Sequence, residues 1–138
     1  MSGERTVYSL EGMAVPESID LLQDLIEAVR VDHPDVGGQD LGLFETAVVE
    51  IAGNLAEHGH RAGGAPYKFR LEVHSDRLAG TLTDEGPPLP EWPPVPVADP
   101  DPLAESGRGL ALAGAVLDTL SYERREGLNA WLMVRNRR

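Results

Sequence analysis

The chain has no cysteine among its 138 residues, which excludes disulfide bonds, thiol catalysis and zinc sites built on thiolates. This absence is compatible with a reducing compartment. Basic residues are also scarce, because the chain has 12 lysines and arginines but 23 aspartates and glutamates, with a formal net charge of -11. Most of the surface therefore repels a phosphate backbone, and nucleic acid is not expected as a partner. A small polyanion can still bind where backbone amides and a local cation offset that field.

The chain also lacks long apolar runs and internal repeats. No apolar run approaches the length that spans a bilayer, and the opening residues MSGERTVYSLEG have no basic-then-apolar signal pattern. We therefore expect a cytoplasmic protein without membrane contact. The length suits a single domain over residues 1–138, large enough for one hydrophobic core.

A helical pattern over residues 43–60 carries three polar residues on or beside its apolar stripe. Glu50, Asn54 and His58 recur at four-residue spacing, with Asn54 and His58 within or at the edge of the apolar face and Glu50 on its flank. Such side chains are costly unless a partner or a ligand satisfies them. The stretch is therefore a candidate wall of a site, although solvated polar residues at the border of a stripe are also common. The stripe consists of Leu43, Phe44, Ala47, Ile51 and Leu55.

Periodicity predicts the remaining elements. Apolar residues at helical spacing indicate a helix over residues 17–31, and Asp40 is expected to cap the helix that follows. Alternating residues indicate a first strand and two antiparallel hairpins. The predicted strands are residues 6–10, 67–74, 77–83, 121–125 and 128–135. In the last of these strands, Trp131 and Met133 share one face.

The segment 87–102 holds eight of the eleven prolines. Proline lacks an amide donor and clashes with regular structure, so neither a helix nor an inner strand can form there. Such a segment can be an interdomain linker, but too little chain follows it to build a second domain. A long irregular loop inside one domain is more often a lid or a binding loop.

Gly107 and Gly109 are expected just before an apolar helix that continues to residue 120. Glycines at a helix start let an anion approach the exposed backbone N–H groups, and the helix dipole adds to the attraction. A glycine pair alone is weak evidence, because it also serves as a plain turn.

The order of these motifs resembles the GHKL ATPase superfamily of gyrases, heat-shock chaperones and histidine kinases. The shared order is a helix with Glu-x-x-x-Asn-x-x-x-His, a strand running into Asp-x-Gly, a long loop, and Gly-x-Gly-Leu opening a helix. The short single domain and the segment ETAVVEIAGNLAEHGH look most like the bacterial anti-sigma factor serine kinases. The resemblance covers about residues 17–134, and three motifs in the expected order are more specific than any one of them.

The resemblance implies roles for the three helix residues. Asn54 matches the asparagine that holds Mg²⁺ against the nucleotide phosphates, and Glu50 matches the carboxylate that acts as general base. An amide oxygen is a neutral hard ligand suited to Mg²⁺, and a carboxylate one turn away can take the proton of an attacking hydroxyl. His58 lies where such kinases often carry a histidine. It either hydrogen-bonds a phosphate or ends the helix as a satisfied core histidine.

The resemblance also implies contacts to the base and the phosphates. Asp84 matches the aspartate that accepts a hydrogen bond from the adenine amino group, and Gly86 lets the backbone pass close to the base. Without the other motifs, Asp84 would be an ordinary turn aspartate. The chain departs from the family pattern Asp-x-Gly-x-Gly at Pro88, which alters the start of the lid. The residues expected at the phosphate side are Ser106, Gly107, Arg108, Gly109 and Leu110.

The implied fold is an α/β two-layer sandwich of the Bergerat type, in which helices cover one face of a mixed, mostly antiparallel sheet. ATP is expected between the long helix and a lid at about residues 85–106. The implied protein is an anti-sigma factor that binds ATP and Mg²⁺ and phosphorylates a serine of a STAS-type anti-anti-sigma protein. Its other partners would be a sigma factor and a second copy of the chain.

Two alternatives remain open. A module that sequesters its partner without phosphoryl transfer would carry the same Glu50 and Asn54. A metal hydrolase built on Glu50, His58 and His60 is weaker, because side chains two residues apart diverge by about 160° on a helix if both histidines lie there. The chain also has no His-Glu-x-x-His pattern.

Overall fold

The computed structural model describes residues 5–61, 65–86, 88 and 105–138, with the side chains of residues 58–61 and 105–108 outside this description. These residues form three helices and five strands. In chain order the elements are β1 (Thr6–Met13), α1 (Ser18–Asp32), α2 (Gly38–Arg61), β2 (Pro66–Val73), β3 (Arg77–Asp84), α3 (Glu105–Val116), β4 (Thr119–Arg125) and β5 (Leu128–Asn136).

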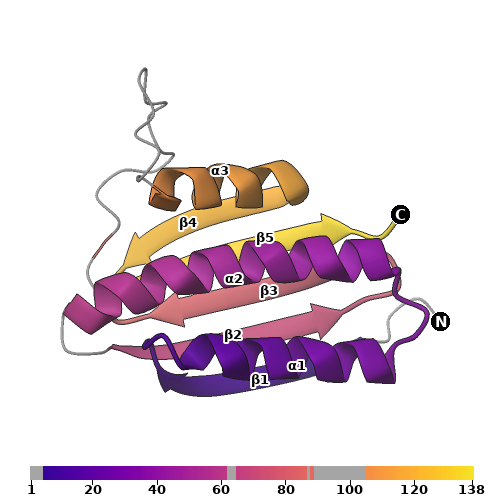
Figure 1. Cartoon of the computed structure of the whole chain (residues 1–138), viewed down its shortest axis with the longest axis horizontal. Coiled ribbons are helices and arrows are strands. Elements are labelled where there is room, and N and C mark those ends of the chain that lie inside the picture. The colour runs from indigo at the N-terminus through magenta and orange to yellow at the C-terminus, as the bar shows by residue number, and fades with distance from the viewer. Residues whose placement is uncertain (1–4, 62–64, 87, 89–104) are drawn as a thin grey trace.

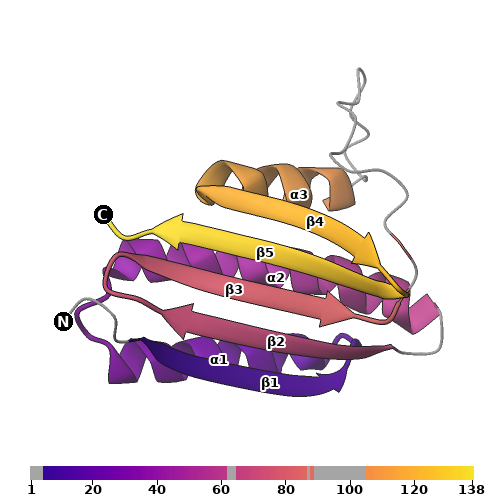
Figure 2. The ribbon, with the colours of Figure 1, turned by 180° about the vertical axis from the view of Figure 1, so that it is seen from behind.

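The five strands form one sheet in the order β1-β2-β3-β5-β4. The three helices lie on the same side of this sheet, and the other side is bare of helices in the described chain (Figures 1 and 2). The two-layer α+β fold predicted from the sequence is therefore confirmed. All the described pairings are antiparallel, so the sheet is not mixed. Two helices connect β1 to β2, and the chain consequently enters β2 at the end of the sheet where β1 finishes.

The core lies between the sheet and the helices. Every second residue of β2 is buried, and the apolar stripe of α2 faces the same layer. Phe44 of α2 packs directly over β3 at Gly80, where an added Cβ would lie 3.0 Å from Cζ of the Phe44 ring. This close approach sets the height of α2 above the sheet. The largest fully buried side chains include Phe44, Phe69, Leu22, Ile26, Leu41 and Ile51.

Three boundaries differ from the sequence-based expectation. The expected apolar helix begins and ends earlier, as α3, so Gly107 and Gly109 lie inside the helix rather than before it. Leu120 belongs to β4 instead of the helix, because it pairs with Met133 of β5. β1 extends beyond its expected end, because Met13 still pairs with β2.

Asp40 forms a buried ion pair and is not the residue that begins α2. The helix starts at Gly38, so Asp40 lies in its first turn and only 3% of it is exposed. Its Oδ1 lies 3.0 Å from Nε of Arg135 on β5, and its Oδ2 accepts a hydrogen bond from the Arg138 backbone N over 2.9 Å. Arg135 Nη1 also donates to the carbonyl of Val116 over 2.6 Å. These contacts connect the start of α2, the end of α3 and the end of β5.

Two further arginines bind aspartates at the same end of the sheet. Arg137 Nη2 lies 3.0 Å from Asp35 Oδ2, and Arg137 Nη1 donates to the His74 carbonyl over 2.9 Å. Arg138 Nη2 lies 2.8 Å from Asp118 Oδ1. We call this region the arginine end, and it comprises Asp35, Asp40, Asp118, Arg135, Arg137 and Arg138.

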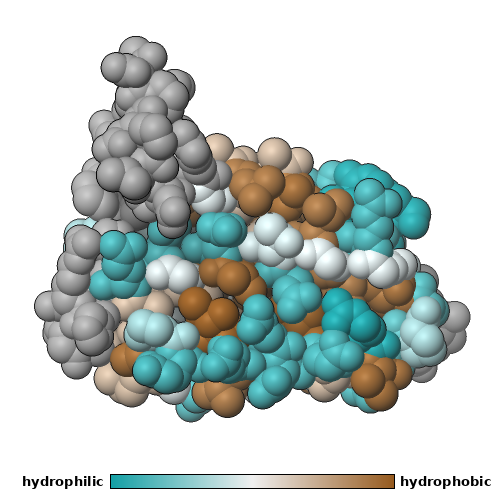
Figure 3. Space-filling model, in the orientation of Figure 1, coloured by the Kyte–Doolittle hydropathy of each residue, from teal (hydrophilic) through white to brown (hydrophobic). Residues whose placement is uncertain are grey.

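The helix side of the molecule has a mixed surface (Figure 3). Hydrophobic atoms gather over α3, and hydrophilic residues separate them from the smaller apolar areas nearer α1 (Figure 3). Among the described residues, the large hydrophobic side chain with the greatest exposure is Val31 of α1, at 72%, and Leu112 of α3 is 44% exposed. Within the described residues, none of the helices combines the length and the apolar character needed to cross a membrane.

Candidate functional site

Glu50 and Asn54 lie one turn apart on the second half of α2, and both are partly buried. Asn54 Nδ2 is buried and has no hydrogen-bond partner among the residues that the structure describes. An unsatisfied buried donor costs about 1–3 kcal/mol, so a ligand that bonds to this amide would remove the cost. The polar border of the helix is therefore only partly satisfied by the described protein.

The backbone of α3 lies directly against the Glu50 carboxylate. A Cβ added at Gly109 would collide with Glu50 Oε2 and would lie 3.2 Å from Cδ, so a larger residue there would displace the carboxylate from its position. Gly109 lies in the second turn of α3, whereas Gly107 lies in the first turn, whose N–H groups have no intrahelical acceptor. Close packing of α3 on α2 thus explains a glycine inside the helix at position 109. Of the two glycines, only Gly107 belongs to the free N–H groups at the helix start.

Asp84 ends β3 and is buried, with 5% of the residue exposed. Its Oδ1 accepts a hydrogen bond from the backbone N of Gly86 over 2.8 Å. A Cβ at Gly86 would lie 2.7 Å from the same oxygen and 3.6 Å from Cβ of Ala65, so the turn closes tightly on the carboxylate. The Glu85 backbone N donates to the Pro66 carbonyl over 3.1 Å. The turn is thereby held against the start of β2.

Three residues of the closing hairpin surround this turn, and they were not predicted from the sequence as site residues. Asn129 of β5 is buried opposite Asp84, and its Nδ2 donates to Asp84 Oδ1 over 3.1 Å. Arg124 Nη1 donates to the Gly86 carbonyl over 2.7 Å, and the Tyr122 hydroxyl donates to Asn129 Oδ1. The sequence pattern could have identified Asn129, because the two-residue period places this polar residue on the same buried face as Trp131.

The structure brings the candidate residues together in two groups. Glu50 and Gly109 are in contact across α2 and α3, and Asp84 and Gly86 form the turn after β3. The second half of α2, the end of β3 and the start of α3 all lie at the end of the sheet opposite the arginine end (Figure 1). We call this region the glycine end, and it comprises Glu50, Asn54, Asp84, Gly86 and Gly109.

Other candidate residues are only partly described. His58, Ser106 and Arg108 belong to α2 and α3, but their side chains lie outside the described residues. Leu110 is buried, with 7% exposed, and belongs to the core. The expected lid at about residues 85–106 also falls largely outside the described residues, which omit 87 and 89–104.

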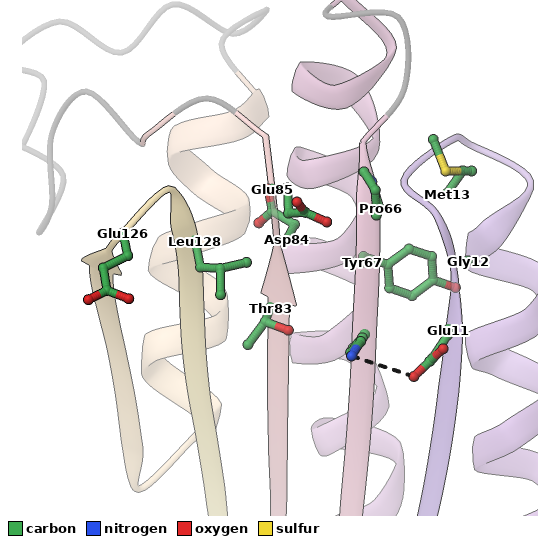
Figure 4. A pocket seen from close by; sticks show the side chains of 11 residues that line it. Glu11, Gly12, Met13, Pro66, Tyr67, Thr83, Asp84, Glu85, Glu126 and Leu128 are labelled. Atoms are coloured by element: carbon green, nitrogen blue, oxygen red, sulfur yellow. Dashed lines mark ion pairs between the residues drawn. The ribbon is translucent and has the colours of Figure 1, made fainter.

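A hollow of about 640 Å³ adjoins Asp84 on the strand side of this end. Figure 4 shows its lining side chains on the strands, with the helices behind the sheet. Lys68 and Glu11, which also line it, are an exposed ion pair with Nζ and Oε1 3.8 Å apart. Burial raises the pKa of Tyr67, which lies over Gly12 at this hollow, and the Ser18 hydroxyl lowers it by less. Since Glu50, Asn54 and Gly109 do not line the hollow, we place the candidate site on the helix side.

The side chains that the structure describes offer no cluster of three or more His, Asp and Glu able to hold a metal ion. The histidines of the metal-hydrolase hypothesis, His58 and His60, lie outside those side chains.

Comparison with family models shows which protein family the chain belongs to. Residues 13–135 match the family model of the histidine kinase-like ATPase domain. The chain belongs to this family. Comparison with curated proteins gave no match. The histidine kinase-like ATPase domain is a GHKL-type fold that binds ATP. The described part of this chain, a five-stranded antiparallel sheet with three helices, agrees with that fold.

Proposed function

We propose that this ATPase domain is an anti-sigma factor with serine kinase activity. It would phosphorylate a serine of a STAS-type anti-anti-sigma protein and sequester a sigma factor. The observation that carries the proposal is that Glu50 and Asn54 lie one turn apart on α2, and that the buried Nδ2 of Asn54 lacks a described partner. A proton acceptor beside an amide that can meet a nucleotide suits phosphoryl transfer, which depends on positioning and charge stabilisation.

The residues at the glycine end fit a bound Mg²⁺-nucleotide. Asn54 offers Oδ1 as a neutral oxygen ligand, and its Nδ2 can donate to a phosphate oxygen, which would satisfy the buried donor. The N–H groups in the first turn of α3 would supply further donors to phosphate. Bound Mg²⁺ would neutralise phosphate charge, which matters in a chain with a net charge of -11.

Glu50 is the proposed general base for the attacking serine hydroxyl. The contact with the Gly109 backbone restricts where its carboxylate can lie, and such restriction is useful in a proton acceptor. Asp84, held by Gly86 and Asn129, is the proposed acceptor for the amino group of adenine. Guanine presents a carbonyl at that position, so this arrangement would favour adenine.

Nucleotide binding can be tested by thermal shift with ATP or GTP, each with and without Mg²⁺. We expect ATP to stabilise the protein more than GTP, and Mg²⁺ to increase the effect of ATP. Asn54→Ala should remove most of the Mg²⁺-dependent part. An equal response to ATP and GTP would contradict the proposed role of Asp84, and an Asn54→Ala variant with full Mg²⁺ dependence would contradict that of Asn54.

Phosphoryl transfer needs a separate experiment with labelled ATP and a candidate STAS protein. Glu50→Gln preserves the shape of the side chain but cannot accept the proton, so we expect retained ATP binding and at least a hundredfold loss of transfer. Full transfer by this variant would exclude Glu50 as the base. Sigma-factor binding by the wild-type protein without any transfer would support sequestration alone.

We also propose that the domain forms a homodimer, which the resemblance to anti-sigma factor kinases supports. Size-exclusion chromatography with light scattering measures this directly. A mass of twice 14.9 kDa at micromolar concentration is the expected result. A mass of one chain over the same concentration range would contradict it.

A further inference from the structure

Arg124 reaches from β4 to the turn that follows β3. Its Nη1 donates to the Gly86 carbonyl over 2.7 Å and to Asn129 Oδ1 over 3.1 Å. The next residue, Arg125, points to the opposite face of the strand, where its exposed side chain pairs with Glu123. Two adjacent arginines therefore have different surroundings, and only Arg124 contacts the turn that contains Asp84.

The hydrogen bonds of Arg124 determine how the Asn129 amide is oriented. An amide has an acceptor oxygen and a donor nitrogen, and here the oxygen accepts from both Arg124 and the Tyr122 hydroxyl. Since two donors hold Oδ1, the amide must present Nδ2 on its other side. That nitrogen donates to Asp84 Oδ1 over 3.1 Å and lies 3.3 Å from the Gly86 carbonyl oxygen.

This orientation decides what Asp84 can bind. With donors from both Asn129 and Gly86 directed at it, Asp84 Oδ1 is held as a hydrogen-bond acceptor. If the Asn129 amide turned over, its oxygen would face the Asp84 carboxylate and repel it. A carboxylate kept as an acceptor selects a base edge with a donor, as in adenine, over one with a carbonyl, as in guanine.

We propose that Arg124 is a positioning residue for base selection, which acts through the Asn129 amide and the Gly86 peptide without contacting the nucleotide. This inference rests on the proposed role of Asp84 as the acceptor for the base. The phosphate contacts belong to α2 and α3, so loss of Arg124 should change discrimination between bases and leave phosphate binding as it is.

The test compares Arg124→Gln with Arg125→Gln, which loses the same charge one residue away on the other face of β4. Dissociation constants for ADP, GDP and inorganic tripolyphosphate, each with Mg²⁺, would be measured by calorimetry. We expect Arg124→Gln to weaken ADP binding about tenfold, the effect of one hydrogen-bonded charge, and to reduce the preference for ADP over GDP. Tripolyphosphate binding should match that of Arg125→Gln, and Arg124→Lys should restore part of the preference.

The outcomes separate this inference from the proposed function. If wild-type protein prefers ADP over GDP and Arg124→Gln keeps the same preference, the positioning role is wrong. If wild-type protein shows no preference, the role of Asp84 fails, and the role of Arg124 fails with it. Should Arg124→Gln not fold, Tyr122→Phe removes the other donor to Asn129 Oδ1 and must then reduce the preference. An unchanged preference in Tyr122→Phe would overturn the proposal.

Discussion

The buried polar groups at the two ends of the sheet differ in whether the protein satisfies their hydrogen bonds. At the arginine end, the buried Asp40 and Arg135 are 3.0 Å apart, and both carry further hydrogen bonds to backbone atoms. At the glycine end, Asn54 Nδ2 is buried without a partner among the described residues, and Glu50 is pressed against a glycine backbone. The buried pair Asp40 and Arg135 is thus satisfied by the protein itself, whereas Asn54 leaves bonding capacity for a ligand.

This difference indicates that the arginine end mainly stabilises the fold and that the glycine end mainly binds the ligand. Functional sites commonly keep polar groups that reduce stability, and the remaining structure compensates for them. The arginine end joins α2, α3 and β5 at the far side of the molecule, and these helices carry the candidate site at their other ends (Figure 1). Mutations at the arginine end should therefore affect stability first, and mutations at the glycine end should affect ligand binding first.

The largest effect is expected from Asp40→Ala. This change leaves the buried Arg135 guanidinium without its carboxylate, which typically costs about 3–5 kcal/mol of unfolding free energy. Urea denaturation followed by circular dichroism would measure the loss. A change below 1 kcal/mol would show that the pair does little for stability.

A double variant separates the charge from the packing. Asp40→Leu combined with Arg135→Met replaces both ions by apolar side chains, a change that is often neutral or stabilising by about 1–4 kcal/mol. We expect it to recover most of the stability lost in Asp40→Ala. Failure to recover would mean that the hydrogen bonds to Val116 and Arg138, rather than the uncompensated charge, cause the loss.

Gly109→Ala tests the close packing at the glycine end. The added methyl would collide with Glu50 Oε2, and overpacking of this kind costs about 1–3 kcal/mol. The better helix propensity of alanine offsets about 1 kcal/mol of this cost, so we expect a net loss of up to about 2 kcal/mol and weaker ATP binding.

Gly114→Ala is the matched control in the same helix. Its Cβ would lie 3.9 Å from Leu120 Cδ2, an ordinary contact, so only the helix propensity changes. This variant should gain about 0.5–1 kcal/mol and bind ATP normally. If both variants gained stability, the Glu50 carboxylate would be able to move away from position 109 at little cost.

Asn54→Leu should make the protein more stable and abolish its binding of Mg²⁺-ATP. Removing an unsatisfied buried donor should raise the unfolding free energy of the nucleotide-free protein by about 1 kcal/mol, while stabilisation by Mg²⁺-ATP disappears. Gln39→Leu makes the same kind of change at an exposed site on α2 and should alter stability by no more than about 0.5 kcal/mol. A less stable Asn54→Leu protein would show that the amide is already satisfied without nucleotide.

The sequence predicted the elements of the glycine end better than their mutual contacts. Four-residue spacing was sufficient to place Glu50 and Asn54 on one helix, and a period of two placed Asp84 at a strand end. The contact of Gly109 with Glu50 depends on how α3 crosses α2, and local patterns do not encode that crossing. Glycine was therefore interpreted as a helix start, whereas packing explains it at position 109.

The arginine end was not anticipated because its pairs join residues far apart in the chain. Asp40 was taken as a helix cap, a local role that its type and position support. Its partner Arg135 is 95 residues away and becomes adjacent only when β5 pairs with β3. The cluster around Asn129 escaped prediction for the same reason, since its bonds to Asp84 also span the sheet.

The smallest predicted effect is on the unfolding free energy at acidic pH, and it concerns the arginine end. The Asn136 backbone N–H and then Arg138 lower the pKa of Asp118, and Arg137 lowers that of Asp35, both from 3.8. A lowered folded-state pKa gives stability that is present above the unfolded value and is lost as pH falls through the folded value. Unfolding free energy should therefore decline below about pH 4 less steeply in Arg137→Gln and Arg138→Gln than in wild type. Arg125→Gln touches no aspartate of the arginine end and should keep the wild-type slope, whereas equal slopes in all four proteins would remove these two pairs from the acid response.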